Sequence, residues 1–303
     1  MNSDYIDIDW PKVKNKLDEI KNYSVGYTNS SKGILSLNNG KTMFVKKAND
    51  QLVSTWTKKE IEIYKVLNKH DFFYTPKLLS YSEDFSCFAI DSLTAEDGWD
   101  WSNKWSEARL DSTFRSIDAL ASIQLSETEK PLFTSDKIRD FINGWQILSD
   151  NQKRLNSLLR KLNTDPIGRT LNLNINNELN FSHKFRFNNT TLVHNDIRSD
   201  NCPYSEFRNV AMLVDWPWAV IGDPRIDCNS LLVHVQLSGF DVTKDYYNKL
   251  DLPTLQWLAG YWFSASTDEE TEPAKIHLRN HQFLSGLKAL ELVRLLSSQY
   301  QIV

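Results

Sequence analysis

The segment that decides the organisation of the chain is Leu192–Cys228, LVHNDIRSDNCPYSEFRNVAMLVDWPWAVIGDPRIDC. Its first apolar residues lead into Asp196, and a second apolar run, Val210–Val214, leads directly to Asp215. Short apolar runs of this kind are typical of buried strands. We therefore predict two short strands that each bring a carboxylate to the edge of one site, with Asn201 between them in the sequence.

The spacing of the polar residues in this segment suits phosphoryl transfer. His194, Asp196 and Asn201 form an H-x-D-x4-N loop, which is the spacing of a kinase catalytic loop. The reaction needs a metal ion on the nucleotide phosphates and a carboxylate that orients the attacking hydroxyl. Because Mg²⁺ prefers oxygen ligands, we expect Asn201 and Asp215 to bind Mg²⁺ and Asp196 to be the catalytic base. His194 is expected to brace the loop.

A third motif, G-D-P-x-x-D at Gly222–Asp227, lies in the same segment of 37 residues. Together the motifs make the segment resemble the kinase-like phosphotransferases of the aminoglycoside phosphotransferase and choline kinase group. The resemblance covers most of the chain and implies an α+β, bilobal protein kinase-like fold. It implies a sheet-rich nucleotide-binding lobe, residues 1–93, and a larger helical lobe, residues 94–303, that binds the acceptor. It also implies ATP (or GTP) and Mg²⁺ as cofactors, and a small molecule with a hydroxyl group as the acceptor.

The resemblance also assigns a phosphate-binding lysine. Lys46 follows an apolar triplet on a predicted strand, as the corresponding lysine does in the family, and Lys47 is the second candidate. Glu60 lies on the inward stripe of a predicted helix, residues 56–69, where the family has a glutamate that pairs with this lysine. The same Glu60 also completes a capping box that begins at Thr57. Both interpretations of Glu60 remain open at this stage.

Further nucleotide contacts rest on position within the family. Residues 27–33 form a small polar turn, where Ser30 and Ser31 would meet phosphate oxygens. An ordinary hairpin turn is the alternative, since the segment has few glycines. The strand that ends near Leu93 would lead to a hinge, where the Asp91 carbonyl and the Leu93 amide would bind adenine.

Hydrophobic periodicity and turn signals predict the remaining elements. A hairpin is expected at Asn38-Asn39-Gly40, and residues 163–190 are expected to be mainly loop. Strands are expected at 34–37, 41–48, 77–81 and 87–93, and helices within 1–23, 99–163, 230–239, 253–265 and 273–299.

Composition excludes several classes of protein. The 303 residues are 41% hydrophobic and 24% charged, with a net charge of −4, which argues against a nucleic-acid-binding protein. No apolar run is long enough to span a membrane, and the first residues, MNSDYIDIDW, lack the features of a signal peptide. The three cysteines lack metal-ligand spacing. We therefore expect a cytoplasmic enzyme.

Two departures from the family leave the acceptor open. Asn195 follows His194, where aminoglycoside kinases usually have glycine and choline kinases have asparagine, and the expected phosphate loop is poor in glycine. Aminoglycosides, choline-like amines, sugars and amino alcohols all fit. The rival hypothesis is a nucleotide-binding pseudokinase without turnover, although Asp196, Asn201, Asp215 and Lys46 are all present.

Overall fold

The computed structural model describes residues 5–19, 29–36, 40–134, 144–171, 173–182, 187–269 and 273–300. The chain divides into two compact units, each formed by segments distant in sequence. Unit 1 comprises Met1–Ser102, Ser106–Phe133 and Leu192–Ile221, and unit 2 comprises Asn103–Trp105, Thr134–Thr191 and Gly222–Val303. The lobe boundary after Leu93 stays a prediction.

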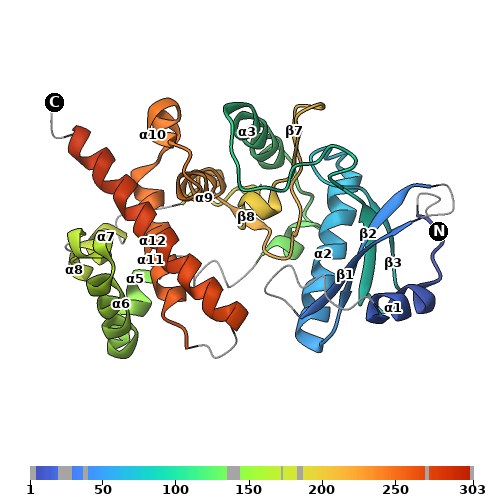
Figure 1. Cartoon of the computed structure of the whole chain (residues 1–303), viewed down its shortest axis with the longest axis horizontal. Coiled ribbons are helices and arrows are strands. Elements are labelled where there is room, and N and C mark those ends of the chain that lie inside the picture. The colour runs from blue at the N-terminus through green and yellow to red at the C-terminus, as the bar shows by residue number, and fades with distance from the viewer. Residues whose placement is uncertain are drawn as a thin grey trace. The chain divides into compact units, whose positions relative to one another are not determined.

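A four-stranded antiparallel sheet forms one part of unit 1 (Figure 1). Its order is β1-β2-β4-β3, and its strands are β1 (Ser30–Ser36), β2 (Thr42–Ala48), β3 (Leu78–Tyr81) and β4 (Cys87–Asp91). Alternate residues of β2, such as Met43 and Val45, are buried, because successive side chains of a strand point to opposite faces. Helix α1 (Trp10–Glu19) packs near β1, and α2 (Gln51–Lys69) packs against β2, β3 and β4.

The first strand begins earlier than the sequence predicted. Ser30–Gly33 were expected in a polar turn, but they pair with β2 in a continuous register. Two residues of that turn, Tyr27 and Thr28, lie outside the described residues. The predicted hairpin between β1 and β2 is confirmed by their antiparallel pairing, although Asn38 and Asn39 also lie outside the described residues.

Helix α2 corrects the predicted capping box. The helix begins at Gln51, and the Asp50 carboxylate caps it by accepting a hydrogen bond from the Val53 amide at 2.8 Å. Thr57 and Glu60 therefore lie inside the helix, where the backbone amides already have partners within the helix. The capping interpretation of Glu60 is wrong.

The rest of unit 1 contains one helix of 15 residues, α3, and several shorter elements. They are α3 (Glu107–Ala121), η1 (Lys130–Phe133), β5 (Thr191–Val193), η2 (Ser199–Asn201), β6 (Tyr204–Ser205), β7 (Val210–Ala211) and β8 (Val220–Gly222). The strand predicted over Val210–Val214 ends at Ala211. The next three amides bind two different segments: Met212 and Val214 donate to the carbonyls of Pro203 and Asn201 in one loop, and Leu213 donates to the carbonyl of Tyr74.

Unit 2 is helical. Its elements are α5 (Gly144–Asp150), α6 (Gln152–Thr164), α7 (Pro166–Thr170), α8 (Ile175–Ser182), α9 (Pro224–Leu237), α10 (Val242–Asp245), η3 (Tyr247–Lys249), α11 (Leu252–Ser266) and α12 (Pro273–Tyr300). Helices α11 and α12 pack along each other, and α5 crosses α11 very closely. A Cβ atom on Gly144 would lie 2.3 Å from the Gly260 carbonyl carbon, so this crossing requires glycine.

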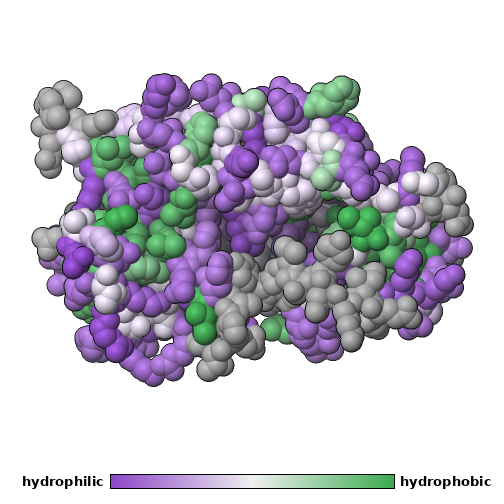
Figure 2. Space-filling model, viewed as in Figure 1, coloured by the Kyte–Doolittle hydropathy of each residue, from purple (hydrophilic) through white to green (hydrophobic). Residues whose placement is uncertain are grey.

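The face drawn in Figure 2 is mostly hydrophilic, with green patches between purple residues. Among the helices of the described ranges, none is long and apolar enough to cross a membrane.

Candidate active site

A buried lysine between two carboxylates lies at the centre of the site in unit 1. The Lys46 ammonium on β2 is 2.7 Å from the Glu60 carboxylate on α2 and 2.8 Å from that of Asp215. The side chains of Lys46 and Glu60 are 8% and 3% exposed, and that of Asp215 is 32% exposed. The predicted pairing of Lys46 with Glu60 is thus present, whereas Lys47 is half-buried and lies on the opposite face of the strand.

The charges of neighbouring residues determine the pKa values of Lys46 and Asp215. Burial alone would lower the pKa of Lys46, but Asp215 and Glu60 outweigh burial and hold that pKa above its ordinary value. Burial would likewise raise the pKa of Asp215, yet Lys46, Lys32 and Arg198 outweigh it and hold the pKa below its ordinary value. Lys46 and Asp215 therefore remain charged at neutral pH.

The backbone of Asp215 is in the left-handed region, with φ of 67°. Few residues other than glycine adopt this conformation, and aspartate is one that tolerates it. The adjacent Trp216 side chain is fully buried and donates to the Thr75 hydroxyl at 3.0 Å. That hydroxyl donates to the Leu213 carbonyl at 2.9 Å. Partners on both sides of Asp215 therefore hold its carboxylate toward Lys46.

The loop that begins at His194 is braced from within. The fully buried His194 ring contacts Trp216, with ring centroids 4.5 Å apart. Its Nδ1 accepts from the Asp196 amide at 3.3 Å, so its Nε2 carries the proton and donates to the Val214 carbonyl at 2.9 Å. Burial lowers the pKa of His194 to about 4, which keeps the ring neutral. These contacts agree with the bracing role expected from the sequence.

The predicted base and the predicted metal ligand are in direct contact. The Asn201 amide nitrogen donates to the Asp196 carbonyl at 2.8 Å and to the Asp196 carboxylate at 3.0 Å. The backbone carbonyl of Asn201 accepts from the Val214 amide at 3.1 Å, which places Asn201 beside the residue that precedes Asp215. The loop therefore gathers all three predicted residues within unit 1.

Arg198 lies beside the carboxylate of Asp196, the predicted base. Its Nε is 3.3 Å from an Asp196 oxygen and 3.3 Å from an Asp200 oxygen. Burial raises the pKa of Asp196 to about 7; Arg198 opposes this shift, and Asp215 and Asp200 add to it. A carboxylate that titrates near neutrality is suited to accept a proton from a hydroxyl.

The donor atoms fit Mg²⁺. Because the side-chain nitrogen of Asn201 is directed at Asp196, its side-chain oxygen, Oδ1, is the atom available to a cation. Asp215 binds Lys46 through Oδ1, which leaves Oδ2. Within the described ranges, no group of three or more His, Cys, Asp or Glu residues is placed to hold a metal. Two oxygen ligands supplemented by phosphates and waters is the usual protein site for Mg²⁺.

Lys32 is a residue that the sequence interpretation missed. It stands directly opposite Lys46 in the register of β1 and β2, so both side chains lie on one face of the sheet. Burial, and then the charge of Lys46, lower its pKa, while Asp215, Glu60 and Asp200 oppose that shift. The hairpin register could have identified it, because counting back from Lys46 through the turn leads to Lys32.

The other predicted nucleotide contacts stay predictions. Ser30 and Ser31 lie in β1, and the Ser31 hydroxyl donates to the Asn49 side chain at 3.1 Å. Asp91 ends β4, and the Leu93 carbonyl accepts from the Trp101 indole at 2.6 Å.

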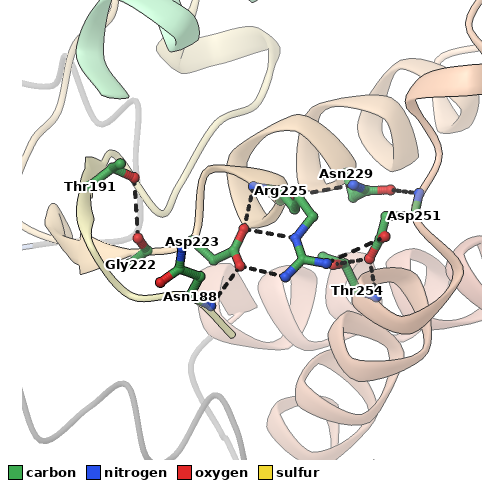
Figure 3. Close-up of polar contacts among 8 residues, drawn as sticks. All are labelled: Asn188, Thr191, Gly222, Asp223, Arg225, Asn229, Asp251 and Thr254. Atoms are coloured by element: carbon green, nitrogen blue, oxygen red, sulfur yellow. Dashed lines mark hydrogen bonds and ion pairs between the residues drawn. The ribbon is translucent and has the colours of Figure 1, made fainter. Parts of the chain in front are cut away.

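The G-D-P-x-x-D motif builds a network inside unit 2 (Figure 3). Asp223 caps α9, and the Arg225 guanidinium binds both oxygens of that carboxylate, at 2.9 and 2.6 Å. Arg225 also lies 3.6 Å from Asp251, which caps α11. Asn229 donates to the Arg225 carbonyl and accepts from the Asp251 amide. Asp227 is 1% exposed within α9.

A family model with the description phosphotransferase enzyme family matches residues 19–261. The chain belongs to this family. It is a small-molecule phosphotransferase with a hydroxyl acceptor. A comparison with curated proteins finds no match.

Solved structures of the same fold include aminoglycoside phosphotransferases and choline kinases. A structure of APH(2'')-Ib with ADP has 18% identity and a TM-score of 0.54, with 94% of this chain and 99% of that chain covered. The streptomycin–ATP ternary complex of APH(2'')-IIa has 17% identity and a TM-score of 0.51, with 94% and 99% covered. Choline kinase LicA from Streptococcus pneumoniae has 11% identity and a TM-score of 0.55, with 93% and 98% covered. At these identities the likeness shows the fold alone.

Proposed function

We propose that this phosphotransferase moves the γ-phosphoryl group of ATP to a hydroxyl of a small molecule, with Mg²⁺ as cofactor. The observation that carries the proposal is the arrangement of Lys46 between Glu60 and Asp215, in the same unit as the contact between Asp196 and Asn201. Positioning and electrostatics supply most of the catalysis in this reaction class. The nucleotide and aminoglycoside complexes among the structural neighbours support the choice of ATP and of a hydroxylated amine or sugar.

Asp196 is the proposed base. Its raised pKa makes it able to accept the proton of the attacking hydroxyl near pH 7. Asn201 holds the Asp196 carboxylate in place through its amide nitrogen. Arg198 lies on the other oxygen of the same carboxylate, so both Asp196 oxygens are oriented before the acceptor arrives.

Lys46 is the proposed phosphate ligand. It is held by Glu60 and Asp215 in a single position, so little ordering is needed when phosphate oxygens bind. Asn201 and Asp215 would hold Mg²⁺. The ion would neutralise charge on the phosphate oxygens. The cytoplasm, where ATP is abundant, is the proposed location.

The experiment that tests this function combines binding and turnover. Thermal unfolding is followed with ATP or GTP, with and without Mg²⁺, and then with a panel of aminoglycosides, choline-like amines, sugars and amino alcohols. A ligand that binds only the folded state raises the melting temperature by mass action. We expect a rise with ATP that depends on Mg²⁺, a further rise with the true acceptor, and ADP release with that acceptor. Nucleotide binding without ADP release for any acceptor would instead support a pseudokinase.

A further inference from the structure

A buried arginine lies beneath the loop that carries Asn201. The Arg109 side chain, on α3, is 1% exposed. It is among the largest fully buried side chains of the described residues. Burying a charged group is costly unless hydrogen bonds and an ion pair compensate for the lost water. The partners of Arg109 therefore indicate what its burial provides.

Two of those partners are backbone carbonyls that lie on either side of Asn201 in the sequence. Nη2 of Arg109 donates to the Cys202 carbonyl at 3.0 Å and to the Ser199 carbonyl at 3.3 Å. Nη1 donates to the Ser102 carbonyl at 2.7 Å and lies 3.7 Å from an Asp100 oxygen. One planar guanidinium thus joins α3 to the start and the end of the turn in which Asn201 lies.

The turn needs this external support. Ser199–Asn201 is a single 3₁₀ turn, and no side chain caps its beginning. Hydrogen-bond geometry in such turns is poor, and they are stable only in short pieces. The Cys202 amide closes the turn with a long bond of 3.4 Å to the Ser199 carbonyl, the same oxygen that Arg109 binds. Arg109 therefore supplies a second donor to the Ser199 carbonyl, whose hydrogen bond within the turn is long.

If this turn is held in place, both proposed ligands of the candidate metal site, Asn201 and Asp215, are held in place as well. Asn201 orients its amide toward Asp196. Its backbone carbonyl accepts from the amide of Val214, which is one residue before Asp215. A displaced turn would move the Asn201 oxygen and the segment that leads to Asp215. Groups that orient metal ligands without touching the metal change metal affinity by about 10–100-fold when they are replaced.

We propose that Arg109 is a positioning residue, which sets the turn Ser199–Cys202 so that Asn201 can bind Mg²⁺ on the nucleotide. This proposal rests on the proposed function, in which Asn201 is a metal ligand. Lysine cannot replace Arg109, because an ammonium lacks the planar fork that reaches several carbonyls at once.

The test is a double-mutant cycle read out by metal binding. Arg109→Lys, Asn201→Ala and the double variant are compared with the wild type. Mn²⁺ binding in the presence of ATP is followed by electron paramagnetic resonance, and the Mg²⁺ concentration for half-maximal thermal stabilisation by ATP is measured. Arg115→Lys is the matched control, because Arg115 lies on the same helix and also donates to a backbone carbonyl, that of Asn209.

We expect Arg109→Lys to raise the half-saturating Mg²⁺ concentration about tenfold or more, and Arg115→Lys to leave it unchanged. In the Asn201→Ala background, Arg109→Lys should have little further effect, because residues that act through one group are not additive. A lower melting temperature with unchanged metal affinity would overturn the proposal and leave Arg109 a purely structural residue. Additive losses in the cycle would also overturn it.

Two controls separate other failures. If Arg109→Lys does not fold, Asp100→Asn takes its place, because it removes the charge that pairs with the Arg109 guanidinium and so loosens the hold on its position, while Arg109 itself stays in the chain. It should raise the half-saturating Mg²⁺ concentration by a smaller factor, and no rise would overturn the proposal. If the wild type binds ATP without any metal dependence, the proposed function fails and this inference fails with it. Metal-dependent binding that Asn201→Ala abolishes but Arg109→Lys does not would overturn the inference alone.

Discussion

At the scale of single residues, two positions in the candidate active site have unusual backbone conformations. Asn195 and Asp215 both have left-handed φ angles, 66° and 67°. Such conformations cost energy and persist only where surrounding contacts enforce them. Here the His194 and Trp216 side chains pack against each other next to both positions. The strain is thus supported by a buried aromatic contact, and the side chains of Asp196 and Asp215 are aimed as a result.

Asp196, the proposed base, should give the reaction a characteristic pH dependence. Because burial raises the pKa of Asp196 to about 7, the base is protonated and inactive below that pH and ionised above it. We expect kcat/KM to rise through a midpoint near pH 7 and to level off above it. Asp196→Asn should lower kcat by about 10²–10⁴-fold. A flat profile between pH 5.5 and 8 in the wild type would contradict the assignment.

At the scale of elements, the β1–β2 hairpin places two lysines opposite each other. Lys46 is already held by two carboxylates, whereas Lys32 on β1 adds a positive charge to the same face. We expect Lys32→Met to weaken ATP binding more than AMP binding, by about 10- to 100-fold, since a hydrogen bond to a charged group contributes about 1.5–3 kcal/mol. Calorimetric titration measures both affinities.

Lys47→Met is the matched control for Lys32. Lys47 lies on β2 with its side chain on the other face, so its removal should leave both nucleotide affinities unchanged. Equal losses for ATP and AMP in Lys32→Met would show that Lys32 acts on the fold and not on the added phosphates.

A second element-scale feature is the network that joins the starts of α9 and α11. Arg225 binds the caps of both helices, and it is 39% exposed, so its ion pairs are partly screened. The caps themselves contribute more, because each replaces a lost backbone partner. We expect Asp223→Ala to lower the free energy of unfolding by about 1–3 kcal/mol and Arg225→Lys by about 1 kcal/mol, measured by urea unfolding.

The effect of Asp223 should depend on pH in a defined direction. Burial would raise its pKa, but Arg225 and the Asn188 amide outweigh burial and hold it below the ordinary value of 3.8. The stabilisation is therefore present above pH 3.8 and is lost as the pH falls through the lower folded-state pKa. Arg160→Lys, on an exposed face of α6, is the control for Arg225→Lys and should change the free energy of unfolding little.

At the scale of the whole molecule, the sequence best predicted contacts between residues that lie close together within one motif. Asp196 and Asn201 are five residues apart in one loop, so their spacing alone brings them together. The contact of Lys46 with Glu60 was expected from the family resemblance, and the inward stripe of α2 agreed with it. Contiguous motifs, and the resemblance that rests on them, therefore predicted most of the candidate site.

What the sequence did not predict depends on tertiary register. Lys32 required the exact pairing of two strands, and Arg109 binds backbone carbonyls, which leave no pattern in the sequence. Asp50 caps α2 ahead of the capping-box pattern at Thr57, because the helix begins at Gln51, before the predicted start at residue 56. The strand before Asp215 is shorter than its apolar run, since the amides after Ala211 bind the loop at residues 201–203 and the Tyr74 carbonyl.

The measurement that tests the central claim most directly is the Mg²⁺ dependence of ATP affinity in three proteins: wild type, Asp215→Asn and Asp196→Asn. Mg²⁺ should strengthen ATP binding in the wild type. Asp215→Asn should lose this gain by tenfold or more, because it removes a metal ligand and a partner of Lys46. Asp196→Asn should keep the gain and lose only turnover. Equal Mg²⁺-dependent affinities in the wild type and Asp215→Asn would contradict the assignment of this site.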